Sequence, residues 1–226
     1  MHPQTCSSIG LPYLLALLGT LLAGCNAGSP VADLSIDIAE DHVAMTLRQE
    51  ISSDGLGPIG IAEFRDSRRE TVFLGMKTGR WGFWDSCIFT VKGGNVGRAT
   101  ADALSHYFRK AGRQTAMVQN GEPVTPVLIT GEIIEMRIDG TSGLVSTHLT
   151  AHIILLLTQE NHITGQTLSV KLTGSDSRNV VWFDPEDAEA VLANSLTDAF
   201  QRWLSGTETE MHAKRGGQHN DPSGRP

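Results

Sequence analysis

The chain has 226 residues, a net charge of −7 and 40% hydrophobic residues, which fits one domain of ordinary size with tails. The acidic balance argues against nucleic acid as a partner, because phosphate binding relies on clustered Lys and Arg. The densest basic group, Arg65, Arg68 and Arg69, is interrupted by Asp66 and Glu70.

The N-terminal segment predicts a bacterial lipoprotein signal. The uncharged run from Ile9 to Ala23 contains Gly and Pro and is shorter than the about 20 apolar residues that a membrane span needs, so it matches the apolar region of a secretory signal. Leu22-Ala23-Gly24-Cys25 then matches a lipobox. The alternatives are an ordinary signal peptide or a buried helix with a chance cysteine. The first residues depart from the pattern, since they carry His2 where Lys or Arg is usual.

A lipobox has consequences for the compartment. The Cys25 thiol takes a diacylglyceryl group and becomes the mature N-terminus, and several acyl chains on one cysteine hold a protein stably on a membrane. Asn26, where an Asp would favour inner-membrane retention, favours the outer membrane, facing the periplasm. We therefore expect a signal peptide over residues 1–24 and a lipidated tether over residues 25–42.

The cysteine count agrees with this prediction. Cys6 leaves with the signal and Cys25 is lipidated, so Cys87 remains alone and forms no intramolecular disulfide. Cys87 precedes a strand-like run, and we expect it to be a buried small hydrophobe rather than a reactive thiol.

We expect the folded part to begin near Val43. Short apolar or alternating runs bounded by turn-prone residues then predict strands, which fall at residues 43–51, 59–66, 71–79 and 87–91.

The segment GRWGFWDSC places Trp81, Phe83 and Trp84 between two of these strands. One interpretation is core capping or a hairpin corner. The other is a partner-binding or membrane-interface surface, because amphipathic aromatic side chains favour such places.

A helix is predicted over residues 96–111, where apolar residues recur with helical spacing. Asn95 caps its start and Gly112 supplies its left-handed stop.

Three longer strands are predicted next, at residues 123–139, 144–158 and 162–174. Short turns between them imply an antiparallel meander with one buried and one polar face. His148 and His152 fall on the polar face. Positions four apart on a strand are about 13 Å apart, so the two histidines cannot share a metal ion. This polar face is a second candidate docking surface.

The last predicted helix covers residues 185–204, with Asp184 as its cap and Pro185 at its first position. Residues 206–226 lack an apolar period and are predicted to be disordered.

This order of elements predicts an α+β domain over residues 43–205. The expected architecture is a two-layer sandwich, with a mostly antiparallel sheet and two amphipathic helices packed on one face.

Catalytic and ligand-binding signatures are lacking in the sequence. The GGNVG segment at residues 93–97 matches neither a phosphate-binding nor a dinucleotide-binding loop, and there is no nucleophile elbow and no zinc spacing. We expect no catalytic residues, no metal and no cofactor.

The chain resembles the YajG-type family of bacterial lipoproteins. The resemblance rests on the lipobox, the Asp66-Ser67-Arg68 turn after a strand, a helix ending in glycine, a sheet meander and a C-terminal amphipathic helix. It covers about residues 55–205 and implies a periplasm-facing envelope lipoprotein, with no catalytic residues to transfer. LptE-like lipopolysaccharide-assembly lipoproteins and auxiliary lipoproteins of lipid-transport systems share a similar layout.

The sequence therefore predicts a non-enzymatic outer-membrane lipoprotein that binds an envelope protein. The alternative is an accessory lipoprotein that binds or transports lipid or peptidoglycan fragments, and a periplasmic hydrolase is a third hypothesis.

Overall fold

The computed structural model describes residues 31–39, 57–79, 82–119 and 125–205, with residues 82–85 described in their backbone alone. These residues fall within one compact unit. The predicted signal peptide, the strand at residues 43–51 and the C-terminal tail lie outside the described residues.

The described part contains a nine-stranded sheet and two helices. Its elements, in chain order, are β1 (Val31–Leu34), β2 (Ile59–Ala62), β3 (Arg65–Asp66), β4 (Gly75–Gly79), β5 (Gly82–Val91), α3 (Val96–Lys110), β6 (Thr115–Val118), β7 (Val127–Ser142), β8 (Thr147–Asn161), β9 (Gln166–Val180) and α4 (Pro185–Leu204).

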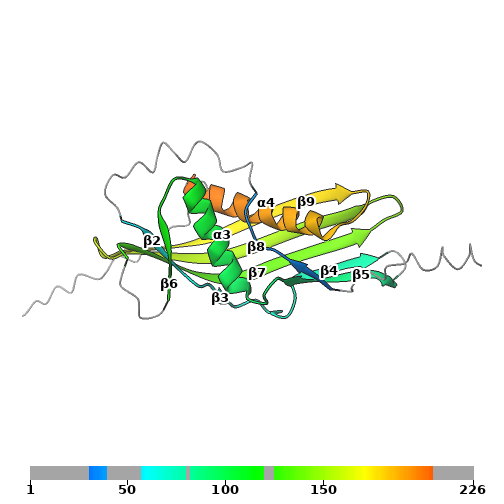
Figure 1. Cartoon of the computed structure of the whole chain (residues 1–226), viewed down its shortest axis with the longest axis horizontal. Helices are drawn as coiled ribbons and strands as arrows, with labels where there is room; N and C mark the ends of the chain where they lie inside the picture. Colours follow the sequence, from blue (N-terminus) through cyan, green and yellow to red (C-terminus); the bar gives the residue numbers. More distant parts are fainter. Residues whose placement is uncertain (1–30, 40–56, 80–81, 120–124, 206–226) are drawn as a thin grey trace, which may run out of the picture. The chain divides into compact units, whose positions relative to one another are not determined.

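Strand β7 joins the two halves of the sheet. Along one edge it pairs antiparallel with β8, from Val127 opposite Asn161 to Ser142 opposite Thr147. Along its other edge it pairs parallel with β2, β3 and β4 in succession. Figure 1 shows β7 beside β8 and β9, which continue the sheet as an antiparallel meander.

The α+β class predicted from the sequence is confirmed, but the mostly antiparallel sheet is wrong. The sheet is mixed, because β1 pairs parallel with β5, β2 pairs parallel with β6, and three short strands pair parallel with β7. Short turns produce antiparallel neighbours, and that argument holds for β7, β8 and β9. The parallel neighbours are joined by long connections that local patterns do not reveal. The two-layer sandwich stays a prediction.

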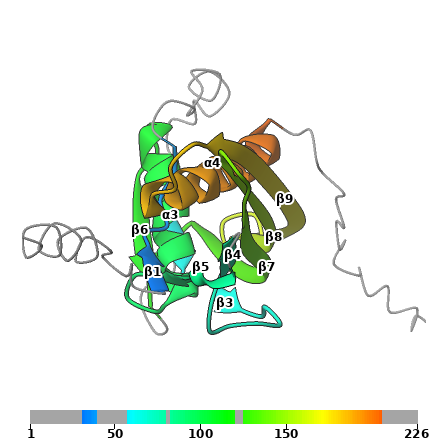
Figure 2. The same ribbon diagram turned by 90° about the vertical axis from the view of Figure 1, so that its right-hand side faces the viewer.

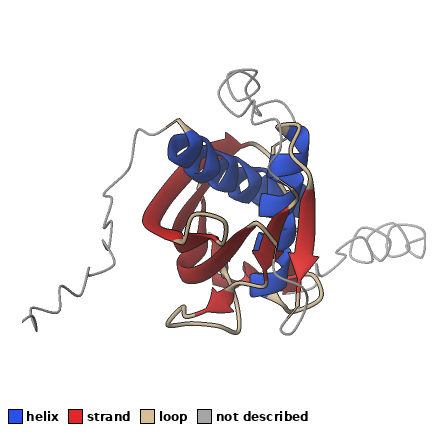
Figure 3. Ribbon diagram, turned by 90° about the vertical axis from the view of Figure 1, so that its left-hand side faces the viewer, coloured by secondary structure: helices blue, strands red, loops and turns tan. Residues whose placement is uncertain are grey.

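Both predicted helices are present, and their caps form. Asn95 Oδ1 accepts the backbone N–H of Arg98 at 2.8 Å at the start of α3. Asp184 and Asp187 form a reciprocal capping box at the start of α4, with Pro185 in its first turn. Helix α4 packs on β8 and β9, whereas α3 packs on β2, β3, β6 and β7. The helices contact each other, as Figure 3 shows.

The core lies between the helices and the sheet face they cover. Edge-to-face ring contacts join the two helices, with ring centroids 5.5 Å apart for Tyr107 and Phe200 and 5.9 Å apart for Phe108 and Trp203. Figure 2 shows β9, β8 and β7 curving beside α4. The side chains of β8 that alternate toward this core are fully or almost fully buried, namely Leu149, Ala151, Ile153, Leu155 and Leu157.

The segment Val31–Ala39 belongs to the folded domain, although the sequence places it in the tether. Strand β1 pairs with β5, and Leu34 and Ile38 are 0% and 3% exposed. The backbone N–H of Ala39 donates to Thr197 Oγ1 of α4 at 3.0 Å. The domain therefore starts at or before Val31 rather than near Val43, because two buried aliphatic side chains hold this segment.

The turn between β7 and β8 also differs from the prediction. The sequence suggests a turn at residues 139–143, but β7 continues through Asp139 and Gly140, which pair with Thr150 and Leu149. The chain turns at residues 143–146 instead. Val145, which the predicted strand at residues 144–158 includes, consequently lies in the turn and is 78% exposed.

The contact between α4 and β9 is close enough to test. A Cβ atom added to Gly174 of β9 would collide with the backbone carbonyl of Ser195 in α4. We expect Gly174→Ala to lower the free energy of unfolding by about 2 kcal/mol, since overpacking forces the two elements apart. Urea unfolding measures this difference. Ser177→Ala, an exposed change on the same strand, should leave stability unchanged, and equal stability of both variants would contradict the close packing.

Candidate functional site

The residues predicted from the sequence to bind a membrane or a partner are largely outside the described structure. Cys25, Asn26 and Trp81 lie outside the described residues, as do the side chains of Phe83 and Trp84. The backbone places the last two at the start of β5, next to the β4–β5 hairpin. Their role in partner binding therefore stays a prediction.

His148 and His152 lie on the sheet face that points away from the helices, and each has its own partner. His148 Nδ1 is 2.8 Å from Asn179 Oδ1, and His152 Nδ1 is 3.4 Å from Glu135 Oε1. Within the described ranges, no group of three or more His, Cys, Asp or Glu side chains is arranged to hold a metal ion.

Two groups with nucleophilic atoms have pKa values that disfavour their reactive forms. Burial raises the pKa of the Cys87 thiol, although the charge of Lys77 opposes the effect. Burial also raises the pKa of Tyr107 to about 12, and the Tyr107 hydroxyl has no hydrogen-bond partner among the described residues. Both groups are therefore protonated at neutral pH. Cys87 is only half-buried against the core, rather than buried as predicted.

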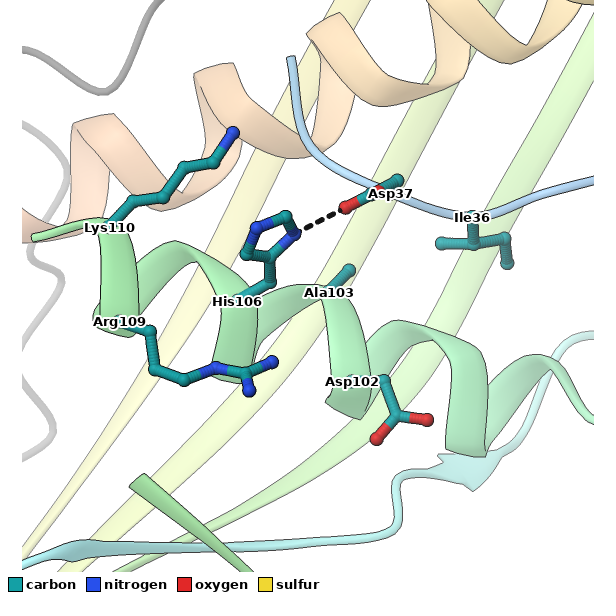
Figure 4. Close-up of a pocket in the computed structure, with 7 residues that line it drawn as sticks. All are labelled: Ile36, Asp37, Asp102, Ala103, His106, Arg109 and Lys110. Atoms are coloured by element: carbon teal, nitrogen blue, oxygen red, sulfur yellow. Dashed lines mark hydrogen bonds and ion pairs between the residues drawn. The ribbon is translucent and has the colours of Figure 1, made fainter. Parts of the chain in front are cut away.

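A shallow depression of about 550 Å³ lies beside α3 (Figure 4). His106 Nδ1 and Asp37 Oδ1 are 2.8 Å apart there, and this pair ties the segment after β1 to the helix. Asp102, which also lines the depression, pairs with Arg98 one helical turn away at 3.2 Å. The charges in this depression are of both signs, and the His106–Asp37 contact has a structural role in fixing the N-terminal segment.

The most distinctive surface is the side of the sheet that points away from α3 and α4, which we call the helix-free face. Val31 of β1, Ile88 of β5 and Met76 of β4 occupy paired positions on it and form a row across three strands. Their exposed fractions are 41%, 38% and 41%. Side chains of adjacent strands at paired positions point to the same face, so these three make one apolar strip.

An irregularity in β7 extends the strip. The pairing of β7 with β8 shifts register between Ile133 and Glu135, which is a β-bulge, and this shift turns Ile134 outward, where it is 43% exposed. Ile134 lines a groove of about 630 Å³ beside the strip. The groove is bounded by β4, by β7 and by the loop between β3 and β4, and its lining includes Phe73, Met76, Ile134 and Met136 as apolar residues, with Arg69, Glu70, Glu135, Arg137 and Asp139 as charged ones.

The loop that forms one wall of this groove is held by a buried arginine. The Arg68 side chain is 4% exposed, and its Nε and Nη2 atoms donate to the two carboxylate oxygens of Asp66 at 2.9 and 2.8 Å. Nη1 and Nη2 also donate to the backbone carbonyls of Phe73 and Thr71 at 3.2 Å each. Arg68 therefore closes the loop on itself and fixes the groove wall.

Asp66 responds to this pairing. Burial alone would raise the pKa of Asp66, but the hydrogen bonds and the charge of Arg68 outweigh burial and hold the pKa below its ordinary value of 3.8. Arg68, part of the densest basic group in the sequence, is thus internal to the fold and unavailable to an outside ligand.

The helix-free face combines an apolar centre with a charged rim. Arg137 Nε and Asp139 Oδ2 are 2.6 Å apart on this rim. Such a combination is typical of protein-binding surfaces, in which aliphatic and Met side chains fill the centre and polar groups surround it. Sequence reasoning missed Val31, Ile88, Met76 and Ile134. A signal existed for two of them, because the adjacent apolar pairs Ile88-Phe89 and Ile133-Ile134 put one apolar side chain on each face of a strand.

Comparisons with known proteins give structural matches alone. No family model and no curated protein matches the chain. Among solved structures, protein XCC0632 from Xanthomonas campestris, assigned to DUF330, is 11% identical with a TM-score of 0.45, over 79% of this chain and 93% of that one. The hypothetical protein CT253 from Chlamydia trachomatis is 8% identical with a TM-score of 0.34, over 67% of this chain and 93% of that one. At these values the similarity assigns no function to this chain.

The Arg68–Asp66 pair can be tested by substitution and by pH. We expect Asp66→Asn to lower the free energy of unfolding by about 2 kcal/mol, because a buried guanidinium loses its charged partner. Since the folded-state pKa of Asp66 is lowered, its contribution to stability is complete above pH 3.8 and is lost as the pH falls below that value. Urea unfolding as a function of pH measures both effects, and Asp66→Asn should flatten the acid loss.

Asp139→Asn is the matched control for this substitution. Its partner Arg137 has a 63% exposed side chain, and exposed ion pairs contribute about 0–1 kcal/mol. Equal destabilisation by the two substitutions would contradict the special role of the buried pair.

Proposed function

We propose that this protein is an outer-membrane lipoprotein, anchored through a lipid on Cys25 and facing the periplasm, that acts without catalysis by binding an envelope protein. The lipobox around Cys25 and the neighbouring Asn26 support the anchor and the compartment. The resemblance to YajG-type lipoproteins supports the class. In the described part of the chain, neither helix has the length and apolar character of a membrane span.

The observation that carries the binding role is the helix-free face. Val31, Ile88, Met76 and Ile134 are each about two-fifths exposed and come from four different strands. An apolar area that is continuous across strands is costly to leave in water. Oppositely charged side chains at its border would set the orientation of a partner.

The extent of this surface favours a protein partner over a small ligand. The apolar strip from Val31 to Met76 runs across the sheet and continues into the groove at Ile134. A small ligand would be enclosed on most sides, whereas these side chains are spread over a broad surface. Arg68 further keeps the loop beside the groove ordered in the free protein, so that binding need not order it.

A second candidate is the accessory lipoprotein that binds or transports lipid or peptidoglycan fragments. The groove supports it, because a floor with Phe73, Met76 and Ile134 lies next to Arg69 and Arg137. This arrangement suits an amphiphile with an anionic group. Native mass spectrometry of protein purified from membranes distinguishes the two, since lipid bound in addition to the Cys25 modification favours the second candidate.

The anchor is tested by replacing the predicted lipidated residue. We expect Cys25→Ala to abolish the diacylglyceryl modification, detected by mass spectrometry of the N-terminal peptide, since the thiol is its acceptor. Membrane fractionation should show loss of the mature, lipid-anchored form. Cys87→Ala is the control and should leave modification and fractionation unchanged. An unmodified Cys25 in the unaltered protein would overturn the proposal.

The binding face is tested by introducing charge into it. We expect Met76→Glu and Ile134→Glu each to weaken recovery of a specific envelope protein, because a buried, unpaired carboxylate at an interface is unfavourable. Crosslinking in intact cells followed by purification measures recovery. Ile163→Glu, on the 66% exposed side chain of the β8–β9 turn, is the matched control. If all three folded variants retain every partner, the helix-free face is not the binding site.

A further inference from the structure

A second apolar surface lies at one end of the sheet. Leu144 and Val145 in the β7–β8 turn are 77% and 78% exposed, and Val181 and Trp182 between β9 and α4 are 67% and 87% exposed. We call these four residues the apolar end. Isolated exposed apolar side chains are normal on protein surfaces, but these four are more exposed than any on the helix-free face and occupy two neighbouring loops.

The register of the strands brings the two loops together. Thr147 is the first residue of β8 and pairs both with Ser142, the last residue of β7, and with Val180, the last residue of β9. Both loops therefore leave the sheet from the same level. The β4–β5 hairpin turns at this end as well, because Thr78 of β4 pairs with Thr141 of β7. Figure 1 shows the ends of β4, β7 and β9 pointing the same way.

The composition of these loops fits a lipid interface. The β7–β8 turn, residues 143–146, reads Gly-Leu-Val-Ser and carries no charge. Trp182 is followed by Phe183, whose ring turns inward to pack on Phe89 with centroids 6.0 Å apart, so the loop that carries Trp182 is held against the core. Trp is enriched where membranes meet water, because its ring is apolar and its N–H can bond with water or lipid headgroups.

The direction of β1 shows which end of the sheet Val31 faces. β1 runs parallel to β5, and β5 leads away from the hairpin at the apolar end. Val31, the first residue of β1, is therefore the residue of this strand nearest the apolar end. Val31 pairs with Ile88, Ile88 pairs with Met76, and Met76 pairs with Asp139. Val31 therefore lies at the same height along the strands as Asp139. Asp139 is three positions before the end of β7, which corresponds to about 10 Å along the strand.

The chain between the predicted anchor and β1 is short. Cys25 precedes Val31 by six residues, and six residues of fully extended chain span about 20 Å. A lipid on Cys25 can therefore reach the level of the apolar end. The opposite end of the sheet, where Val127 pairs with Asn161, lies twelve positions from Asp139, or about 40 Å away. A membrane that holds Cys25 cannot lie at that opposite end.

We propose that the apolar end inserts into the headgroup region of the lipid bilayer that holds Cys25. The inference rests on the proposed lipidation of Cys25 and adds to it a second, non-covalent membrane contact. This contact fixes the orientation of the domain, so that the strands stand on the membrane with β7 and β9 pointing toward it. The helix-free face then stands beside the bilayer, open to a partner protein.

Apolar burial rather than charge drives this contact. Among the described residues, the charged side chains that follow Trp182 in the chain are acidic, because Asp184, Glu186 and Asp187 lie at the start of α4. Asp187 is paired with Arg178 at 3.6 Å. We therefore expect the contact to form on uncharged lipid and to be insensitive to salt, unlike a basic surface that binds anionic headgroups.

The test reports the depth of single positions in vesicles. The mature lipidated protein with Cys87→Ala carries one added cysteine, Leu144→Cys or Ile163→Cys, labelled with an environment-sensitive fluorophore. Each is reconstituted into phosphatidylcholine vesicles with or without brominated acyl chains, which quench fluorophores in the bilayer. We expect a blue shift and loss of emission at position 144 and neither at position 163. Adding Trp182→Asp should reduce the loss at position 144, with circular dichroism confirming the fold.

The other outcomes separate the two proposals. If the protein floats with the vesicles and the label at position 144 stays in water, or positions 144 and 163 are quenched alike, the apolar end does not contact lipid and the anchor stands. If the label at position 144 is shielded only when native envelope proteins are present, the apolar end binds a protein. If the shielding depends on protein density in the vesicles, the apolar end binds a second copy of the chain. Either result overturns the inference. If mass spectrometry finds no lipid on Cys25, both proposals fail.

Discussion

Strand β7 hydrogen-bonds with β8 along one edge over its whole length and with β2, β3 and β4 in succession along the other. The remaining strands join the sheet through these neighbours of β7, since β9 pairs with β8, β6 with β2 and β5 with β4. The bulge in β7 keeps Ile133 and Met136 in the core on either side of the shift, with exposed fractions of 0% and 3%. The same shift turns Ile134 out to the opposite face. One irregularity thus serves both the packing of the core and the groove outside it.

Local features of the sequence predicted local structure well. Helix α4 has the predicted bounds, and α3 ends one residue early, because caps and apolar spacing act within a few residues of each other. The β7–β8 turn was predicted too early in the chain, because Asp139 and Gly140 are residue types common in turns. In the structure Gly140 is a strand residue, and it lies under the Lys77 and Leu149 side chains, where an added Cβ would be crowded. Parallel pairing was missed because it joins segments far apart in the chain.

The candidate surfaces were less predictable than the fold. The exposure of Met76 and Ile88 depends on which sheet face the helices cover. Val31 joins the same row through β1, but this strand has only four residues, which are too few for an alternating pattern to be recognised in the sequence. The Asp66-Ser67-Arg68 turn was visible in the sequence, but that its arginine is buried and bonds to Phe73 and Thr71 follows from tertiary structure. His148 and His152 were placed on the correct face, since alternation along a long strand is a strong signal.

The participation of β1 in the sheet has a mechanical consequence for a tethered protein. If Cys25 is lipidated as proposed, a load from the membrane would reach the described domain at Val31 and act along β1, parallel to its neighbour β5. The hydrogen bonds between the two strands, together with the buried Leu34 and Ile38 side chains, then bear the load jointly in shear rather than one after another. The edge strand β1 would thus resist extension by such a load for as long as it stays paired with β5.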